Sequence, residues 1–278
     1  MRIRADRTRL YLGFRGLALL RDWPTGDPEV AAAHIEVMRA LLDGRDAPGE
    51  IEIDDHGLAA AYELWATFYD DEPNGLIEVE ELFVEALVAD LPEGVVIDAA
   101  CGTGRHAALL SSLGHDVIGV ERSAAMLDVA RRKGIAGRFL LGDLHALPLA
   151  DASADLAICG LALTHVTDLG PPIAELARIV RPGGHVLLTD IHPIAAALGG
   201  QAQPGRPDGT RMLARNHVHW ASDYIAAFRD AGLEIVRCEE PRAARTFLHS
   251  IEHAELREHL EAAVLGLPLA MIWLLRRR

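Results

Sequence analysis

Several residue types that mark particular protein classes are scarce in this sequence. Lys133 is the only lysine, there are 3 cysteines, and aromatic residues make up 5% of the chain. The cysteines (Cys101, Cys159 and Cys238) are far apart and form neither a CxxC pair nor a zinc motif. We therefore expect buried, reduced thiols and no disulfide framework, as is typical of a cytoplasmic protein.

Long apolar runs are missing as well. The apolar stretch 262–275 is interrupted by Gly266 and Pro268 and is too short to span a membrane. The arginine-rich first residues lead into only a short apolar stretch, which is not typical of a signal peptide. The net charge of −14 disfavours the phosphate backbone of a nucleic acid as a partner. We expect a cytoplasmic protein that binds neither membrane nor nucleic acid.

From Gly94 onward, short apolar runs alternate with amphipathic helical stretches. This alternation predicts an α/β fold, in which a parallel sheet carries helices on both faces. The expected strands are 95–99, 116–121, 137–142, 154–160 and 185–191, and the expected helices are 103–113, 123–133 and 171–181. A helix at 222–231 and strands at 233–239 and 270–277 complete the pattern.

Residues 1–55 lie outside this alternation, and we interpret them as an accessory segment. The apolar stretch 10–20 fits either a strand or a helix. Asp27 and Pro28 are typical of a helix start, and an acidic loop is expected at 50–55. The apolar stripe of that helix would consist of Ala31, Ile35, Met38 and Leu42. The segment would serve as a lid, a dimer contact or added packing, and 56–278 would form the main domain with inserts at 194–221 and 241–268.

The end of the first expected strand carries the clearest binding signal. Val95–Ile97 ends in Asp98, and a tight turn of small residues leads to Gly104, where a helix begins. Gly102 and Gly104 permit positive φ and a close approach of ligand to backbone. The following helix directs its free N–H groups to the same point. The pattern predicts a nucleoside-bearing ligand, and its glycine spacing also fits a dinucleotide fingerprint.

Acidic residues end the next two expected strands. Glu121 lies 19 positions after Gly102, which places it to accept hydrogen bonds from both hydroxyls of a ribose. The alternative is only a favourable interaction with the next helix N-terminus. Asp143 ends the third strand, and the even spacing from Asp98 through Glu121 to Asp143 matches three successive strand–helix units. Ligands bind beyond such strand ends in open α/β sheets.

The segment 98–104 (DAACGTG) resembles the first motif of the class I S-adenosylmethionine-dependent methyltransferases. Ala100 replaces the glycine most often found there, and we expect slightly tighter packing from its methyl group. The Arg-Pro-Gly-Gly turn at 181–184 and a strand at the chain end also resemble this family. The resemblance implies a doubly wound, mostly parallel seven-stranded sheet whose antiparallel last strand lies between the fifth and sixth.

The same resemblance implies S-adenosylmethionine as cofactor and S-adenosylhomocysteine as product. The residues that it assigns to cofactor binding are Tyr69, Asp98, Ala100, Gly102, Gly104, Glu121, Arg122, Met126, Asp143, Leu144, Gly160 and His165. Helices are expected at 59–71 and 74–87, and the aromatic residues Tyr62, Trp65 and Tyr69 share one broad face of the first. This face resembles a helix that covers the cofactor in small-molecule methyltransferases, although packing on the core explains it equally well.

Histidines near strand ends are candidates for a general base. His192 follows the fifth strand and is the first choice, because Pro193 restrains the chain after it. His165 follows the fourth strand, and His219 lies in the insert beyond the fifth. Each of these histidines could equally be structural. The His217-x-His219 spacing has no further ligand nearby, so we expect no metal.

We therefore expect a methyltransferase that acts on a small-molecule acceptor, at oxygen more readily than at nitrogen or carbon. The large inserts suggest an enclosed pocket for a specialised metabolite, and a homodimer is compatible with the accessory segment. One alternative is a cyclase or binding protein that keeps the cofactor without methyl transfer. An NAD(P)-dependent oxidoreductase is a minor alternative, since Lys133 has Val129 rather than tyrosine four positions before it.

Overall fold

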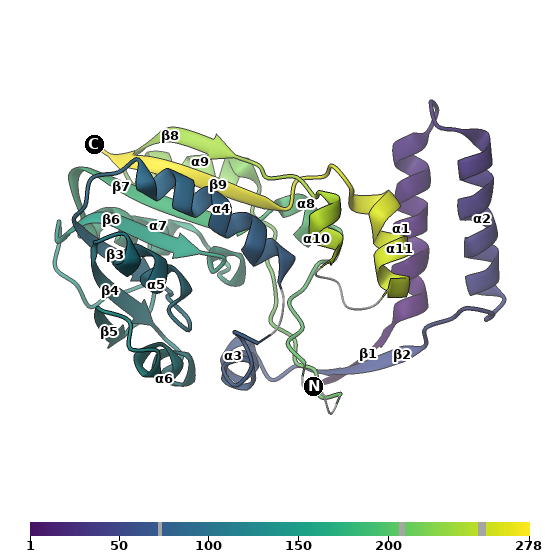
Figure 1. Ribbon diagram of the computed structural model, residues 1–278, viewed down its shortest axis with the longest axis horizontal. Helices are drawn as coiled ribbons and strands as arrows, with labels where there is room; N and C mark the ends of the chain where they lie inside the picture. Colours follow the sequence, from purple (N-terminus) through teal and green to yellow (C-terminus); the bar gives the residue numbers. More distant parts are fainter. Residues whose placement is uncertain (72–73, 206–208, 250–253) are drawn as a thin grey trace.

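The computed structural model describes residues 1–71, 74–205, 209–249 and 254–278. Figure 1 shows a central sheet with helices on both faces and, beside it, a smaller layer that contains the N-terminal helices. The strands are β1 (Arg2–Asp6), β2 (Glu50–Asp54), β3 (Val95–Ala99), β4 (Asp116–Glu121), β5 (Arg138–Leu141), β6 (Ala154–Gly160), β7 (Val180–Ile191), β8 (Leu233–Glu239) and β9 (Ala270–Arg277).

The helices of the described ranges vary widely in length, and none of them is long and apolar enough to cross a membrane. They are α1 (Arg7–Asp22), α2 (Pro28–Leu42), α3 (Leu58–Trp65), α4 (Gly75–Ala89), α5 (Arg105–Ser112), α6 (Ala124–Arg132), α7 (Gly170–Ile179), α8 (Pro193–Ala197), α9 (Ala221–Asp230), α10 (Arg245–His249) and α11 (Ala254–Val264). A short 3₁₀ helix covers Leu163–His165.

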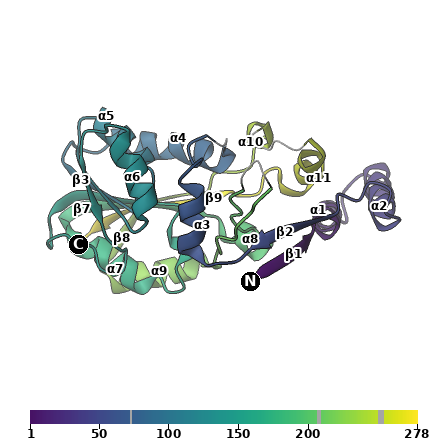
Figure 2. The same ribbon diagram turned by 90° about the horizontal axis from the view of Figure 1, so that it is seen from below.

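The main sheet has the order β5-β4-β3-β6-β7-β9-β8. Strands β5, β4, β3, β6 and β7 run parallel, whereas β9 pairs antiparallel with both β7 and β8. This order confirms the predicted doubly wound sheet with its last strand inserted between the fifth and sixth. Figure 2 shows α4, α5 and α6 on one face and α7 and α9 on the other.

Two apolar cores hold these layers together. Successive strand residues point to opposite faces, so Ile97 of β3 packs in the core beneath α7 and α9, and Val96 packs in the core beneath α4 and α5. The strands predicted at 95–99, 116–121, 154–160, 233–239 and 270–277 are confirmed at those bounds. β7 begins earlier than predicted, because Val180 already pairs with Ala154 of β6.

Residues 1–55 form a two-stranded ribbon whose strands are joined by a helical hairpin. β1 and β2 pair antiparallel, with Ile3 opposite Ile53. The acidic loop predicted at 50–55 is therefore wrong. Acidic residues alternate with isoleucines in β2, and Glu52 and Asp54 pair with Arg2 on β1. The apolar stretch 10–20, for which strand and helix were both open, lies in α1.

Helix α2 packs on α1 through a face that differs from the predicted stripe. Its start is as predicted, since the Asp27 side chain accepts from the backbone N–H of Glu29 at 2.8 Å. However, Ile35 is 41% exposed and Leu42 is 71% exposed, whereas His34 and Leu41 are buried. The helix is turned in this way because His34 contacts a buried arginine of α1.

That arginine, Arg15, is only 6% exposed and connects α1 with α2 and α11. Its guanidinium donates to Nδ1 of His34 at 3.1 Å and to Nδ1 of His259 at 2.9 Å, and it pairs with Glu258 at 3.1 Å. Tyr11 stacks on His259 with ring centroids 4.3 Å apart. Burial, together with the charge of Arg15, lowers the pKa of His34. The accessory segment thus packs on the 241–268 insert.

The 194–221 insert connects the accessory ribbon with the end of β6. The N–H of Asp54 donates to the carbonyl of Arg211 at 2.8 Å, and the N–H of Leu213 donates to the carbonyl of Asp54 at 3.0 Å. Arg215 then pairs with Asp55. Two residues later, the N–H of His217 donates to the carbonyl of Thr164 at 2.7 Å. The insert is therefore bonded to the end of the accessory ribbon on one side and to the 3₁₀ helix after β6 on the other.

The thiols are only partly as predicted. Cys101 and Cys159 are buried and free, whereas Cys238 is exposed. Cys238 lies on β8, the edge strand of the sheet, where Ile235 and Val236 are exposed as well. The prediction of three buried thiols is wrong at this position because helices cover the edge strand incompletely.

We predict that Arg15→Met lowers the free energy of unfolding by about 2–4 kcal/mol, because a buried guanidinium and its hydrogen bonds are lost. Arg9→Met is the matched control on the same helix, since the Arg9 side chain is 87% exposed, and it should leave stability essentially unchanged. Urea unfolding of both variants measures the difference. If Arg15→Met and Arg9→Met have the same free energy of unfolding, the contacts of Arg15 do not stabilise the accessory segment.

Candidate functional site

A cavity of about 350 Å³ lies at the carboxyl ends of β3, β4, β5 and β6, the position at which open α/β sheets bind ligands. All of the residues predicted to bind the cofactor, except Asp98 and Gly104, line it. The other lining residues are Leu58, Ala59, Tyr62, Glu63, Cys101, Thr103, Arg105, His106, Val120, Ser123, Ala124, Gly142, His145, Leu161, Ala162 and Val166. The contacts of this set with a cofactor stay predictions.

The turn after β3 presents its backbone to the cavity. Ala100 and Gly102 have φ of +61° and +55°, and a Cβ on Gly102 would meet no atom within 4 Å. Ala100 thus has a conformation that favours glycine. It is partly buried and packs against the apolar core, and the effect of its methyl group on the tightness of packing stays a prediction. Gly104 has φ of +83°, which confirms the predicted positive φ, and its close approach to a ligand stays a prediction. A Cβ there would lie 2.8 Å from Ile135 and 3.2 Å from Ala130, so Gly104 permits close packing on α6.

Glu121 holds the turn and the start of α6 together. Its Oε2 accepts from the N–H of Gly102 at 3.0 Å, and its Oε1 accepts from the N–H of Ser123 at 2.7 Å. Burial raises the pKa of Glu121, and these backbone donors oppose that rise. Each carboxylate oxygen can accept a further bond, so the structural and the ribose-binding roles are compatible.

Asp143 is the more exposed of the two strand-end acids on the cavity wall. It accepts from the backbone N–H of His145 at 2.9 Å and lies 2.7 Å from Nδ1 of the same residue. Arg122 lies 3.8 Å away. Burial alone would raise the pKa of Asp143, but the bonds from His145 and the charge of Arg122 lower it. The residue is therefore a stable hydrogen-bond acceptor at neutral pH.

Aromatic residues of α3 and the turn after it form the opposite wall. Tyr62 and Tyr69 line the cavity, and Trp65 packs between them, with ring centroids 5.7 Å and 4.9 Å away. The helix ends at Trp65, well before the predicted residue 71. Among the described residues of the accessory segment, none lines the cavity. The aromatic residues thus form this wall without a contribution from α2, and their role as a cover of the cofactor stays a prediction.

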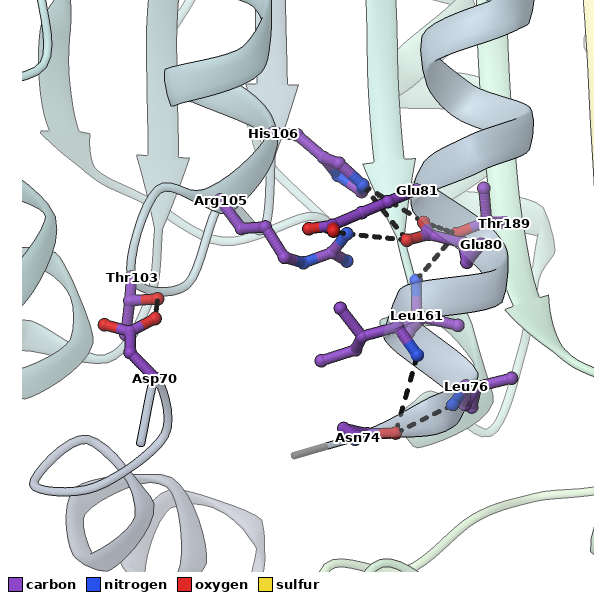
Figure 3. Close-up of polar contacts among 11 residues, drawn as sticks. Asp70, Asn74, Leu76, Glu80, Glu81, Thr103, Arg105, His106, Leu161 and Thr189 are labelled. Carbon is purple, nitrogen blue, oxygen red and sulfur yellow. Dashed lines mark hydrogen bonds and ion pairs between the residues drawn. The ribbon is translucent and has the colours of Figure 1, made fainter. Parts of the chain in front are cut away.

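Asp70 fixes this wall to the glycine turn. It accepts from the hydroxyl of Thr103 at 2.8 Å (Figure 3). It also pairs with Lys133, the only lysine, at 2.8 Å. Thr103 belongs to the turn after β3, and Lys133 follows α6. Two elements that form the cofactor side of the cavity therefore hold the aromatic wall in place.

His165 lies on the cavity wall at the end of β6. Its Nδ1 is 2.8 Å from the carbonyl oxygen of Arg215. A carbonyl can only accept, so Nδ1 carries the proton, and a neutral ring has a free lone pair on Nε2. Burial lowers the pKa of His165, which favours this neutral form. The ring also meets Tyr62 edge to face, with centroids 5.6 Å apart.

The other two predicted bases lie away from the cavity, and their assignments are corrected. Pro193 starts α8 directly after His192, so the His192 ring turns back to accept from the N–H of Ile194 and lies 3.2 Å from Glu240. Nε2 of His219 lies 2.8 Å from the carbonyl oxygen of Val166. Within the described ranges, no group of three or more His, Cys, Asp or Glu residues could hold a metal ion.

Comparisons with known proteins place this geometry in a family. A family model described as a methyltransferase domain matches residues 97–188. A malonyl-[acyl-carrier protein] O-methyltransferase of Yersinia pestis is 34% identical over 220 residues, which cover 78% of this chain and 82% of the relative. The enzyme with that name from Pseudescherichia vulneris is also 34% identical, over 217 residues that cover 72% of this chain and 84% of the relative.

Among solved structures, an S-adenosylmethionine-dependent methyltransferase from Mesorhizobium loti is similar, with a TM-score of 0.54 and 26% identity. The match covers 69% of this chain and 96% of that one. The chain belongs to the class I S-adenosylmethionine-dependent methyltransferases. It is an enzyme that transfers the methyl group of this cofactor, so the oxidoreductase and non-transferring alternatives are set aside.

One buried carboxylate oxygen of this methyltransferase has no hydrogen-bond partner, and the cofactor could supply one. Oδ2 of Asp98 is buried and has no hydrogen-bond partner, and the residue is 1% exposed. Burial raises the pKa of Asp98 to about 6, although the charges of His106 and Arg105 oppose the rise. A cation such as the cofactor's ammonium group would satisfy this carboxylate. When bound, the sulfonium of the cofactor supplies an activated methyl group.

Sequence reasoning missed Glu80, Arg105 and His106. Glu80 lies on α4 with an exposed fraction of 0%, and it pairs with Arg105 at 2.6 Å and with His106 at 3.1 Å. Arg105 and His106 line the cavity. The arginine–histidine pair directly after the glycine turn was the only local signal. Glu80 itself looks like one acid among several on an amphipathic helix.

We predict that Glu121→Ala weakens S-adenosylhomocysteine binding by about 1–3 kcal/mol, because hydrogen bonds to a charged acceptor are lost. Asp128→Ala on α6 is the control, since Asp128 is exposed, pairs with Arg131 and is not among the lining residues of the cavity. Isothermal titration calorimetry on both variants gives the comparison. Wild-type affinity in Glu121→Ala would remove the ribose assignment.

We also predict that Asp98→Asn stabilises the ligand-free enzyme at pH 7 and weakens cofactor binding. The pKa of Asp98 in the folded protein, about 6, lies above the ordinary value of 3.8 for this group. The stability that this group contributes is therefore present below pH 3.8 and lost as the pH rises through 6. At pH 7 the ionised form costs about 3 kcal/mol, which asparagine avoids.

The control for this substitution is Asp190→Asn. Asp190 is equally buried, and burial raises its pKa to about 7, but it accepts from the hydroxyl of Tyr224 at 2.6 Å. The Asp190→Asn substitution should leave cofactor affinity unchanged. Thermal unfolding and calorimetry together measure both properties. If Asp98→Asn binds S-adenosylhomocysteine as tightly as wild type, the carboxylate does not contact the cofactor.

Proposed function

We propose that this methyltransferase methylates an oxygen of a small, hydroxyl-bearing acceptor, and that His165 takes the proton from that hydroxyl. The observation that carries the proposal is the state of the His165 ring. Nδ1 is committed to the carbonyl of Arg215, which leaves Nε2 as the acceptor on a residue that lines the cavity. An acceptor hydroxyl becomes a stronger nucleophile as such a base removes its proton.

The surroundings of His165 suit an uncharged acceptor. Tyr62 contacts the His165 ring, and three apolar residues (Leu58, Ala162 and Val166) line the same cavity. The lining arginines, Arg105 and Arg122, are paired with carboxylates. An anionic acceptor would therefore find no unpaired cation among the described lining residues. A phenol or alcohol can pack against Tyr62 and donate its hydrogen bond to His165.

The relatives support a second candidate, the free carboxylate of a malonyl group on an acyl carrier protein. The similarity extends over 82% of the Yersinia pestis enzyme of that name. A carboxylate is ionised at neutral pH and needs no base, so this acceptor requires alignment alone. The two candidates share methyl transfer to oxygen, but they differ in what they demand of His165.

We predict that His165→Asn lowers turnover of a hydroxyl acceptor by about 10²–10⁴-fold, because the base is lost. The asparagine amide can still donate to the Arg215 carbonyl. Since burial lowers the pKa of His165, wild-type turnover should be constant at neutral pH and fall on the acid side. That acid limb should be absent in the variant.

The measurement is S-adenosylhomocysteine formation with malonyl-acyl carrier protein and with a panel of uncharged phenols and alcohols. His185→Asn is the control, because His185 lies at the opposite end of the parallel strands, where it pairs with Leu156. Suppose that the enzyme methylates malonyl-acyl carrier protein and none of the uncharged acceptors, and that His165→Asn does not lower this turnover. That result would establish the second candidate and reject His165 as the base.

A further inference from the structure

Glu80 is a fully buried carboxylate that no step of the proposed chemistry uses. Both of its oxygens are occupied. Arg105 donates to Oε2 at 2.6 Å, His106 Nε2 lies 3.1 Å from Oε1, and the hydroxyl of Thr189 donates to Oε1 at 2.6 Å. Burial alone would raise the pKa of Glu80, but His106 and Arg105 lower it to about 2. The residue is a permanent anion between α4, α5 and β7 (Figure 3).

The bond to Glu80 fixes the direction of the Thr189 hydroxyl. A carboxylate only accepts, so the hydroxyl proton points to Glu80 and an oxygen lone pair is free for another donor. That donor is the N–H of Leu161, at 3.2 Å from Oγ1 and 2.9 Å from the Thr189 carbonyl. A chain of oriented bonds thus runs from Glu80 through Thr189 to Leu161.

Leu161 requires such support because its backbone is strained. It has φ of +53°, in a region that favours glycine, and such a conformation costs about 1–3 kcal/mol. It lines the cavity. A Cβ on the preceding Gly160 would overlap the His106 ring and lie 3.2 Å from Glu80. The backbone at 160–161 therefore packs directly against the side chains of His106 and Glu80.

Arg105 reaches the cavity from another side. Its Nη1 atom donates to Glu80 at 2.6 Å and to Glu81 at 3.2 Å. Because Arg105 also lines the cavity, the carboxylates of α4 set the direction of its guanidinium. Glu121 and Asp143 are assigned to the nucleoside, so Arg105 and Leu161 bound the remaining part of the cavity, which we assign with Asp98 to the amino-acid portion of the cofactor.

We propose that Glu80 is a positioning residue for the amino-acid portion of the cofactor. One carboxylate on α4 orients the Arg105 guanidinium directly and holds Leu161 in its left-handed conformation through Thr189. Glutamine is a poor substitute because it has only one acceptor oxygen. With its amide nitrogen at the Oε2 position it would face the Arg105 guanidinium, which only donates, and with the nitrogen at the Oε1 position it could no longer accept from the Thr189 hydroxyl. Either arrangement breaks one branch of the network.

Two ligands separate positioning from general structure. S-adenosylhomocysteine carries the amino-acid portion, and 5′-methylthioadenosine shares the nucleoside and thioether without it. Calorimetry should show that Glu80→Gln weakens S-adenosylhomocysteine binding about tenfold or more and 5′-methylthioadenosine binding by less than about twofold. Glu175→Gln on α7 is the control, since Glu175 binds Arg178 and the N–H of Leu147 outside the cavity.

Thr189 supplies an independent variant if Glu80→Gln fails to fold. Thr189→Val removes the hydroxyl and should weaken S-adenosylhomocysteine binding about threefold to tenfold, whereas Thr189→Ser keeps the hydroxyl and should bind within about twofold of wild type. Equal affinities of Val and Ser variants overturn the proposal. So does a Glu80→Gln variant that loses both ligands alike, because that result indicates a purely structural role.

Discussion

Parallel pairing brings the ends of β3, β4, β5 and β6 to one edge of the sheet, and the cofactor end of the site depends on this constraint. Asp98, Glu121 and Asp143 follow three of these strands and differ in how their charge is balanced. Backbone N–H groups stabilise Glu121, and His145 with Arg122 stabilises Asp143. Asp98 alone keeps a buried oxygen without a partner. Of these three carboxylates, Asp98 is therefore the one that can still accept a positively charged donor, and its contact with the cofactor's ammonium group stays a prediction.

The acceptor end depends on chain segments outside that edge. The tautomer of His165 is set by the carbonyl of Arg215, and Arg215 is held by Asp55 at the end of the accessory ribbon. Arg211 and Leu213 form backbone hydrogen bonds with Asp54 at the end of β2. The accessory segment thus acts on the site through the insert and through no lining residue of its own among those described.

The difference between these two ends explains what the sequence could predict. Glu121 and Asp143 were predictable because a strand–turn–helix unit fixes a residue's place from local pattern alone. The partners Glu80, Arg105 and Thr189 meet only through packing of α4 on the sheet, and Glu80 has no local mark that distinguishes it from Glu78 or Glu81. His192 was misplaced for a related reason. Topology puts it at the correct edge, but Pro193 starts a helix and the ring becomes its cap.

Strain at the same edge shows how the ligand-free site is maintained. Ala100 and Leu161 adopt left-handed conformations at the ends of neighbouring strands, where the chain must turn away from the cavity at once. Such residues persist only when their surroundings hold them, at a cost of about 1–3 kcal/mol each. Asp98 adds the cost of a buried charge. The compensating interactions lie behind the edge, in the α4 carboxylate and its partners. A bound cofactor adds its own stabilisation to the folded state, so the cost of the open edge is offset in the complex.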